Sequence, residues 1–207
     1  MAIDRRARAG DKGRMGEVFI FGYGSLVNRR THGYACVRRA GVRGWQRVWR
    51  YTPWREVAFL DVVRAPGHRL RGLVLGVPGV APELDRRERA YHRIEVTREI
   101  DGAWPPDRPV SMFAIPPDRD DGGRGRGHVL LLSYIDVVAQ GYLAEFGADG
   151  VHEFFETTKG WDAPVLDDRA APRYPRAVSP DARLAALVDQ WLETLGATIV
   201  PPRAAPS

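Results

Sequence analysis

Lysine and cysteine are scarce in this sequence. Of its 31 basic residues only Lys12 and Lys159 are lysines, and Cys36 is the single cysteine. One cysteine excludes an internal disulfide framework and any metal cluster built from cysteine alone. A chain without disulfides fits a reducing compartment. We therefore expect a cytoplasmic protein.

Long apolar runs are also missing. No segment approaches the roughly 18 to 20 consecutive apolar residues that a membrane-spanning helix needs. Residues 1–16 are rich in charge and lack the apolar centre of a signal peptide. From these two absences we expect a soluble protein with no membrane partner.

The net charge of +5 raises the question of nucleic-acid binding. The arginines are spread along the chain and mixed with acidic residues, as in residues 85–89, which read Asp-Arg-Arg-Glu-Arg. We interpret this pattern as a solvated surface and expect no nucleic-acid partner. The alternative, a basic nucleic-acid-binding module, predicts binding that weakens steeply with salt.

The length of 207 residues fits one domain that can bury a core without disulfides. Residues 1–16 carry charges and glycines without apolar periodicity, which predicts a flexible leader. We place the domain at residues 17–200 and a flexible, proline-rich tail at residues 201–207.

The hydrophobic pattern predicts strands first and helices later. Runs of β-branched and aromatic residues indicate strands at residues 17–21, 40–51, 57–63, 70–77, 93–97 and 109–115. Helical spacing of apolar residues indicates helices at residues 82–91, 133–146, 150–157 and 181–195. Residues 116–127 read as an exposed loop. This order predicts an α+β domain in which a curved, mixed, barrel-like β-sheet is flanked by helices.

A short glycine-containing loop follows the first predicted strand. It comprises Gly22, Tyr23, Gly24, Ser25 and Leu26. Two glycines around one tyrosine let the backbone turn sharply and point its N–H groups one way, where they can hold a carboxylate or an oxyanion. A simple turn after a strand is the alternative. The loop has neither the Gly-x-Ser-x-Gly of a nucleophile elbow nor the Lys-Ser/Thr ending of a P-loop.

One carboxylate in the predicted helix at 82–91 is a candidate acid/base. Leu84, Glu88 and Tyr91 are spaced at i, i+4 and i+7 and therefore share a face. The apolar character of that face predicts that Glu88 points inward. The alternative is a surface carboxylate paired with the neighbouring arginines.

Two further features carry less information about function. Residues 164–176 contain Asp168, Arg169 and Tyr174; they can form a pocket rim, but we favour an irregular segment held by salt bridges. The histidines show no metal-ligand spacing; they are His32, His68, His92, His128 and His152. We therefore expect no metal.

Together, the loop and the glutamate resemble the gamma-glutamylcyclotransferase family, with its ChaC-like and AIG2-like branches. Tyr23-Gly24-Ser25-Leu26 is similar to the Tyr-Gly-Ser loop of that family. Glu88 stands at the end of Leu-Asp-Arg-Arg-Glu, where the family has its catalytic glutamate. Residues 41–45 and 70–74 resemble the family's inner strands. Arg89, where many members have glycine, and the segment after residue 116 depart from the pattern.

The resemblance implies an enzyme that converts a small γ-glutamyl compound, such as glutathione or a γ-glutamyl peptide, into 5-oxoproline and an amine. It implies Glu88 as the catalytic acid/base, residues 22–26 as the substrate-binding loop and Tyr91 as a possible pocket residue, with no cofactor. Two alternatives remain on the same fold. One is a protein that binds such a metabolite without catalysis, and the other is a specialised enzyme that forms a lactam from a γ-glutamyl amine.

Overall fold

The computed structural model describes residues 16–52, 55–116 and 128–202. The predicted leader at 1–16, the loop at 116–127 and the tail at 201–207 fall almost entirely outside these ranges. The domain bounds that we drew at residues 17 and 200 stay predictions.

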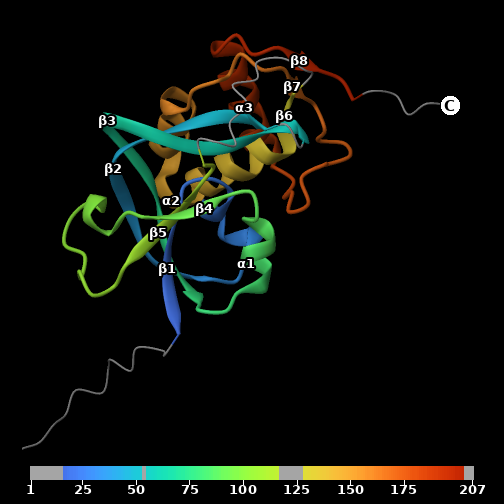
Figure 1. The fold of residues 1–207 in the computed structure, drawn as a ribbon. Coiled ribbons are helices and arrows are strands. Elements are labelled where there is room, and N and C mark those ends of the chain that lie inside the picture. The colour runs from blue at the N-terminus through green and yellow to red at the C-terminus, as the bar shows by residue number, and fades with distance from the viewer. Residues whose placement is uncertain (1–15, 53–54, 117–127, 203–207) are drawn as a thin grey trace, which may run out of the picture.

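A five-stranded mixed sheet in the order β2-β3-β1-β5-β4 forms the centre of the fold (Figure 1). β1 pairs antiparallel with β3 and parallel with β5, so both kinds of ladder meet at the central strand. The strands are β1 (Glu17–Gly22), β2 (Ala35–Thr52), β3 (Arg55–Pro78), β4 (His92–Glu95) and β5 (Val110–Ala114). The α+β class and the mixed sheet that the sequence predicts are thereby confirmed.

The prediction of two separate strands at 57–63 and 70–77 was wrong. Both belong to β3, a single strand of 24 residues. Gly67, with a φ of 85°, lies between the two predicted segments. Glycine adopts this backbone conformation without steric cost, so the strand continues through the residues that we took for a break.

Glycines and register shifts give the sheet its curvature. The pairing of β2 with β3 shifts between Arg43 and Trp45, at Gly44, whose φ is 80°. Such a bulge bends the strand and increases its twist. A Cβ atom at Gly72 would collide with the Gly22 carbonyl. These features account for the curved sheet that the sequence predicts.

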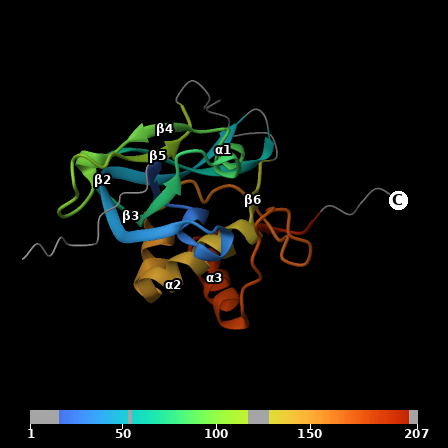
Figure 2. The same ribbon diagram turned by 90° about the horizontal axis from the view of Figure 1, so that it is seen from below.

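Within residues 16–52, 55–116 and 128–202, three α-helices accompany the sheet: α1 (Pro82–Arg87), α2 (Leu132–Thr157) and α3 (Ala182–Thr194). In Figure 2, α2 and α3 lie together on one side of the sheet, and α1 lies apart from them. The backbone of α2 leaves helical geometry at Gly147, with φ 70° and ψ −163°. This break confirms the two predicted helices at 133–146 and 150–157. Asp181 caps α3 by accepting a hydrogen bond from the N–H of Leu184 at 2.8 Å.

A second, small parallel sheet was not predicted. It consists of β6 (Leu130–Leu131), β7 (Val165–Leu166) and β8 (Ile199–Val200), in the order β6-β7-β8. Strands of two residues have no hydrophobic period to detect, so the sequence pattern could not reveal them. Within the described residues, no helix combines the length and apolarity that spanning a membrane requires.

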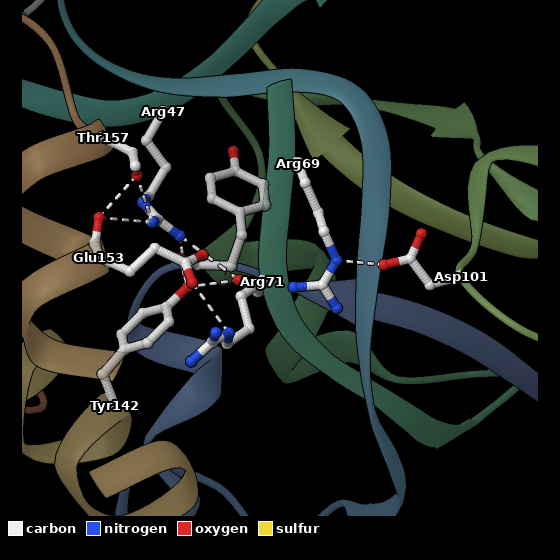
Figure 3. A network of polar contacts seen from close by, with 8 residues as sticks. Arg47, Arg69, Arg71, Asp101, Tyr142, Glu153 and Thr157 are labelled. Atoms are coloured by element: carbon white, nitrogen blue, oxygen red, sulfur yellow. Dashed lines mark hydrogen bonds and ion pairs between the residues drawn. The ribbon is translucent and has the colours of Figure 1, made fainter. Parts of the chain in front are cut away.

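A buried arginine connects α2 with the sheet (Figure 3). Arg47 on β2 is fully buried and donates to the Tyr142 hydroxyl at 2.6 Å and to Thr157 Oγ1 at 2.9 Å. The Tyr142 hydroxyl in turn lies within hydrogen-bond distance of the carbonyls of Tyr23 and Arg71, at 2.9 and 2.6 Å. This arginine–tyrosine network therefore connects α2, β2, β3 and the loop at residues 22–26.

We predict that Tyr142→Phe lowers the free energy of unfolding by about 1 to 3 kcal/mol, because it removes an acceptor from a buried guanidinium and a donor from buried carbonyls. Urea denaturation measures this change. Tyr34→Phe is the matched control, since Tyr34 is only half-buried, and a change within about 0.5 kcal/mol is expected there. Equal effects of the two substitutions would contradict the structural role of the Tyr142 hydroxyl.

Candidate functional site

A cleft and a smaller chamber meet at Glu88. The cleft has a volume of about 710 Å³, within the range of small-molecule sites. The inner chamber, of about 40 Å³, adjoins it and is lined by the loop at residues 22–26. The residues that line both spaces are Ser25, Leu60, Glu88, Tyr91 and Tyr134.

The local structure of α1 turns Glu88 inward. Pro82 occupies the first turn, and Glu88 caps the end of the helix, with its N–H donating to the Leu84 carbonyl at 2.9 Å. Leu84 is fully buried, and the residue four positions later lies on the same face. The Glu88 side chain is only 12% exposed. The predicted inward orientation of Glu88 is confirmed.

Tyr91 lines the site, but it follows a turn and does not lie on the helix that we predicted. The helix ends at Arg87, so Tyr91 does not lie on it as we expected. A turn follows instead, in which the N–H of Tyr91 donates to the Glu88 carbonyl at 2.9 Å. The Tyr91 hydroxyl donates to the Leu60 carbonyl at 3.1 Å, and burial raises its pKa well above the usual value. Tyr91 therefore lines the chamber as a neutral side chain.

Burial raises the pKa of the Glu88 carboxyl from 4.5 to about 7. The positive charges of Arg87 and, less strongly, Arg176 act in the opposite direction. Arg87 Nε lies 3.2 Å from Glu88 Oε1, and its own side chain is 7% exposed. The arginine pairing that we considered as the alternative therefore exists, but inside the protein. A carboxyl group with this pKa can both accept and donate a proton near neutral pH.

Ser25 is the point at which four parts of the chain meet. Its hydroxyl accepts a hydrogen bond from Arg87 Nη2 at 2.7 Å and contacts the Tyr174 hydroxyl at 3.0 Å. The Tyr134 hydroxyl also hydrogen-bonds to Ser25, and the rings of Tyr134 and Tyr174 pack edge to face at 4.9 Å. Arg87 thus joins the loop to Glu88.

The loop needs its glycines for space. After Gly24, Ser25–Val27 forms a 3₁₀ turn. A Cβ atom at Gly24 would lie 2.9 Å from Tyr134 Oη, and one at Gly22 would lie 2.6 Å from Leu26 Cβ. The first N–H groups of such a turn have no acceptor within it. In the described ranges, the N–H groups of Ser25 and Leu26 donate to no protein acceptor.

Tyr23 and Leu26 contribute mainly to the support of the loop. The Tyr23 hydroxyl donates to the Phe113 carbonyl on β5 at 2.7 Å, so this side chain fixes the loop to the sheet. The Leu26 side chain is buried, and its carbonyl lies 2.9 Å from His32 Nε2. Both residues line the inner chamber. The structure thus brings all the predicted loop residues together with Glu88 and Tyr91.

Residues 164–176 are held in place by polar contacts and also form part of the cleft wall, so both interpretations of the sequence apply to them. Asp168 is buried and accepts hydrogen bonds from Ser133 Oγ at 2.6 Å and from the N–H of Arg173 at 2.8 Å. Arg169 forms an ion pair with Asp136 at 2.8 Å. These contacts hold the segment, and residues 173–176 form part of the cleft wall. We had favoured the structural role alone.

Sequence reasoning missed Tyr134 and the role of Arg87. Tyr134 lies near the start of α2, in a helix that the sequence predicted without connecting this residue to the site. Arg87 stood in a charged run that resembled a solvated surface. In the described part of the chain, no three His, Cys, Asp or Glu side chains are placed to hold a metal ion.

Comparison with known proteins shows a likeness of structure where sequence comparison finds none. No family model matches the chain, and no curated protein matches it. The fold is that of the gamma-glutamyl cyclotransferases. One solved structure described as gamma-glutamyl cyclotransferase superimposes with a TM-score of 0.52 at 13% identity, covering 84% of this chain and 99% of the other.

Two other solved structures share this fold. An uncharacterized protein from Homo sapiens has a TM-score of 0.51 at 11% identity, over 84% of this chain and 99% of its own. YkqA from Bacillus subtilis has a TM-score of 0.51 at 15% identity, over 70% of this chain and 56% of its own. The resemblance that the sequence motifs predicted is therefore confirmed at the level of the fold.

The raised pKa of Glu88 makes a prediction about stability. The folded-state pKa, about 7, lies above the value of about 4.5 for a solvated glutamate, so folding takes up a proton between these values. The stabilising contribution of the protonated carboxyl is complete below pH 4.5 and is lost as the pH rises through 7. The free energy of unfolding of wild type should therefore fall by about 3 kcal/mol from pH 5 to pH 8 because of Glu88. Glu88→Gln stays neutral and does not lose this contribution, so its stability relative to wild type should rise by the same amount.

Urea denaturation of both proteins at the two pH values measures this gain. Glu193→Gln on the exposed face of α3 is the matched control, because it removes one carboxylate that is not buried. A Glu88→Gln variant whose difference from wild type is the same at pH 5 and pH 8 would show that Glu88 is not desolvated.

Proposed function

We propose that the protein is a gamma-glutamylcyclotransferase-like enzyme, which releases 5-oxoproline from a small γ-glutamyl amide. The observation that carries this proposal is the position of Glu88. Its buried carboxyl, with a pKa of about 7, lines both the inner chamber and the cleft. The fold shared with a structure described as gamma-glutamyl cyclotransferase supports the proposal.

The reaction begins with a proton transfer to Glu88. The α-amino group of the substrate is mostly protonated near pH 7 and cannot attack in that form. The Glu88 carboxylate takes one proton, and the neutral nitrogen then attacks the γ-carbonyl carbon of the same molecule. This ring closure needs only a folded substrate conformer, because nucleophile and electrophile are already joined.

The second half of the reaction returns the proton. Attack places negative charge on the γ-carbonyl oxygen, and N–H groups of the loop at residues 22–26 are suited to stabilise it or to hold the substrate's α-carboxylate. The Glu88 carboxylic acid then protonates the leaving nitrogen as the C–N bond breaks. The ring nitrogen still carries a second proton, which the regenerated Glu88 carboxylate accepts and passes to the released amine. The products are 5-oxoproline and the protonated amine, and the sequence of steps uses no cofactor. The single cysteine, Cys36, suits a cytoplasmic location for such an enzyme.

A metabolite-binding protein on the same fold is the competing proposal. A binder gains nothing from a carboxyl group whose burial disfavours its charged form. An acid/base catalyst does gain from it, because the most effective pKa lies near the working pH. Release of 5-oxoproline from a panel of glutathione, γ-glutamyl amino acids and γ-glutamyl amines distinguishes the two proposals.

Glu88→Gln should reduce 5-oxoproline release by about 10² to 10⁴-fold near neutral pH, because glutamine keeps the shape but accepts no proton. In wild type, kcat/KM should fall below a pH of about 7 as Glu88 becomes protonated. The deficit of the variant should shrink at high pH, where the substrate's amine is neutral without a base.

A pH–rate series on wild type, Glu88→Gln and the control Glu193→Gln measures these effects. Substrate binding to Glu88→Gln should remain, since the loop is intact. A deficit of equal size at every pH would mean that Glu88 positions the substrate and does not carry its proton.

The loop makes a second prediction about activity. Gly24→Val should impair turnover more than Ser25→Ala, because any Cβ at Gly24 crowds the Tyr134 hydroxyl and fills the chamber. The φ of Gly24 is −117°, so this effect is one of space and not of backbone strain. Gly33→Val is the matched control, since nothing lies within 4 Å of a Cβ there. A Ser25→Ala variant as inactive as Glu88→Gln would instead identify the hydroxyl as an essential group.

A further inference from the structure

The cleft outside the inner chamber has an unusual set of charges. The arginines that line it are Arg86, Arg87, Arg89, Arg173 and Arg176. Arg87 is already engaged with Glu88 and Ser25. Across the described residues, the other four form no ion pair with a carboxylate.

Elsewhere on the surface, partly exposed arginines commonly have acidic partners. Arg39 pairs with Glu145 at 3.1 Å, and Arg64 pairs with Glu99 at 3.1 Å. The arginines of the cleft differ because they gather around one cavity and outnumber its described acidic residues. They come from two separate parts of the chain, α1 with the turn after it and residues 173–176.

The acidic residues in the same wall reduce its positive charge but do not cancel it. Apart from the Arg87–Glu88 pair, the charged residues in the described part of the wall are four arginines and the two glutamates Glu56 and Glu83. The excess is therefore two positive charges. A ligand that fills the cleft is matched best when it brings two negative charges.

The arrangement of the two spaces decides which part of a substrate meets these arginines. If Glu88 exchanges protons with the reacting nitrogens, the γ-carbonyl carbon must lie beside it, at the junction. The chamber of about 40 Å³ has room for only a small group, so the part beyond the scissile bond extends into the cleft of about 710 Å³. The leaving group is thus the part of the substrate that the arginines contact.

We propose that the preferred substrates are γ-glutamyl compounds whose leaving group carries two negative charges, such as an amino dicarboxylic acid or a short acidic peptide. The proposal rests on the proposed function for the identity of the γ-glutamyl end. The arginine-lined cleft disfavours γ-glutamyl amines that carry a second positive charge, because like charges repel there. The enzyme then releases 5-oxoproline and an amine that carries two carboxylates, and Glu88 returns the proton to the nitrogen of that amine.

The expected selectivity is moderate because the arginines are partly exposed. Arg86, Arg89 and Arg173 are exposed, and water and salt screen such charges. An exposed ion pair typically changes an equilibrium by about two- to fivefold. Two such pairs predict a preference of about tenfold at low ionic strength, decreasing as salt is added.

Three ligands that differ only in the leaving group test this proposal. They are γ-glutamyl-glutamate, γ-glutamyl-glutamine and γ-glutamyl-glutaminamide, whose leaving groups carry two, one and no carboxylates. Calorimetric titration of Glu88→Gln gives their affinities without turnover, and 5-oxoproline release by wild type gives kcat/KM. Each measurement is made at low and at high ionic strength. Affinity should decrease in the order of the number of carboxylates, with the largest salt effect for γ-glutamyl-glutamate.

Two substitutions test the arginines: Arg86→Gln and Arg173→Gln. Each should reduce the preference for γ-glutamyl-glutamate by about two- to fivefold. For the binding experiment, each is combined with Glu88→Gln. Neither residue contributes to the pKa shift of Glu88, so proton transfer is not altered directly. Arg183→Gln on the exposed face of α3 is the matched control and should leave the preference unchanged.

The proposal would be overturned if the three ligands bound with equal affinity. It would also be overturned if the preference for γ-glutamyl-glutamate did not respond to salt, or if both arginine variants kept that preference in full. Failure to bind any of the three ligands would also overturn it. A clear preference in binding without 5-oxoproline release by wild type would support the charge selectivity and reject the proposed reaction. The two proposals can therefore fail separately.

Discussion

The burial of the Arg47 guanidinium is the constraint on which the rest of the structure depends. A fully buried cation is tolerated only when its N–H groups find acceptors, and Arg47 finds them on α2, in the Tyr142 and Thr157 hydroxyls, and in carbonyls of the chain. The Tyr142 hydroxyl extends this network to the carbonyl of Tyr23. One side chain of β2 thereby places α2 against the sheet and holds the loop that begins the candidate site.

The candidate site also depends on a buried ionisable side chain, which here is an acid. Glu88 is buried beside Arg87, which also donates to Ser25 of the loop. Desolvation nevertheless exceeds the attraction, so the pKa of the carboxyl rises to about 7. The same ion pair at the protein surface, without this desolvation, would lower the pKa of the carboxyl. The combination of a close arginine and a raised pKa leaves a group that exchanges protons near neutral pH, which is the property that the proposed cyclisation requires.

Much of the fold and part of the site could be predicted from local pattern. The strands around Phe21 and Met112, the helix end at Gly147 and the cap of α3 follow from periodicity and glycine placement, which are properties of neighbouring residues. The continuity of β3 and the three short strands of the second sheet could not be predicted in this way. They depend on pairing with residues far away in the sequence, and no local period reports such pairing.

The amino-acid sequence by itself determined that the loop has glycines at residues 22 and 24, and that Glu88 follows Leu84 by one helical turn, which turns the carboxyl inward. Only the tertiary structure decided what surrounds that carboxyl. Tyr134 and Tyr174 lie on α2 and in the segment before α3, and the folding of the chain brings them to Ser25. The same folding places Arg173 and Arg176 in the wall of the cleft that Arg86 and Arg89 also line. The physical reason is that burial and electrostatic environment are set by long-range packing, whereas the direction of a side chain on a helix is set by its immediate neighbours.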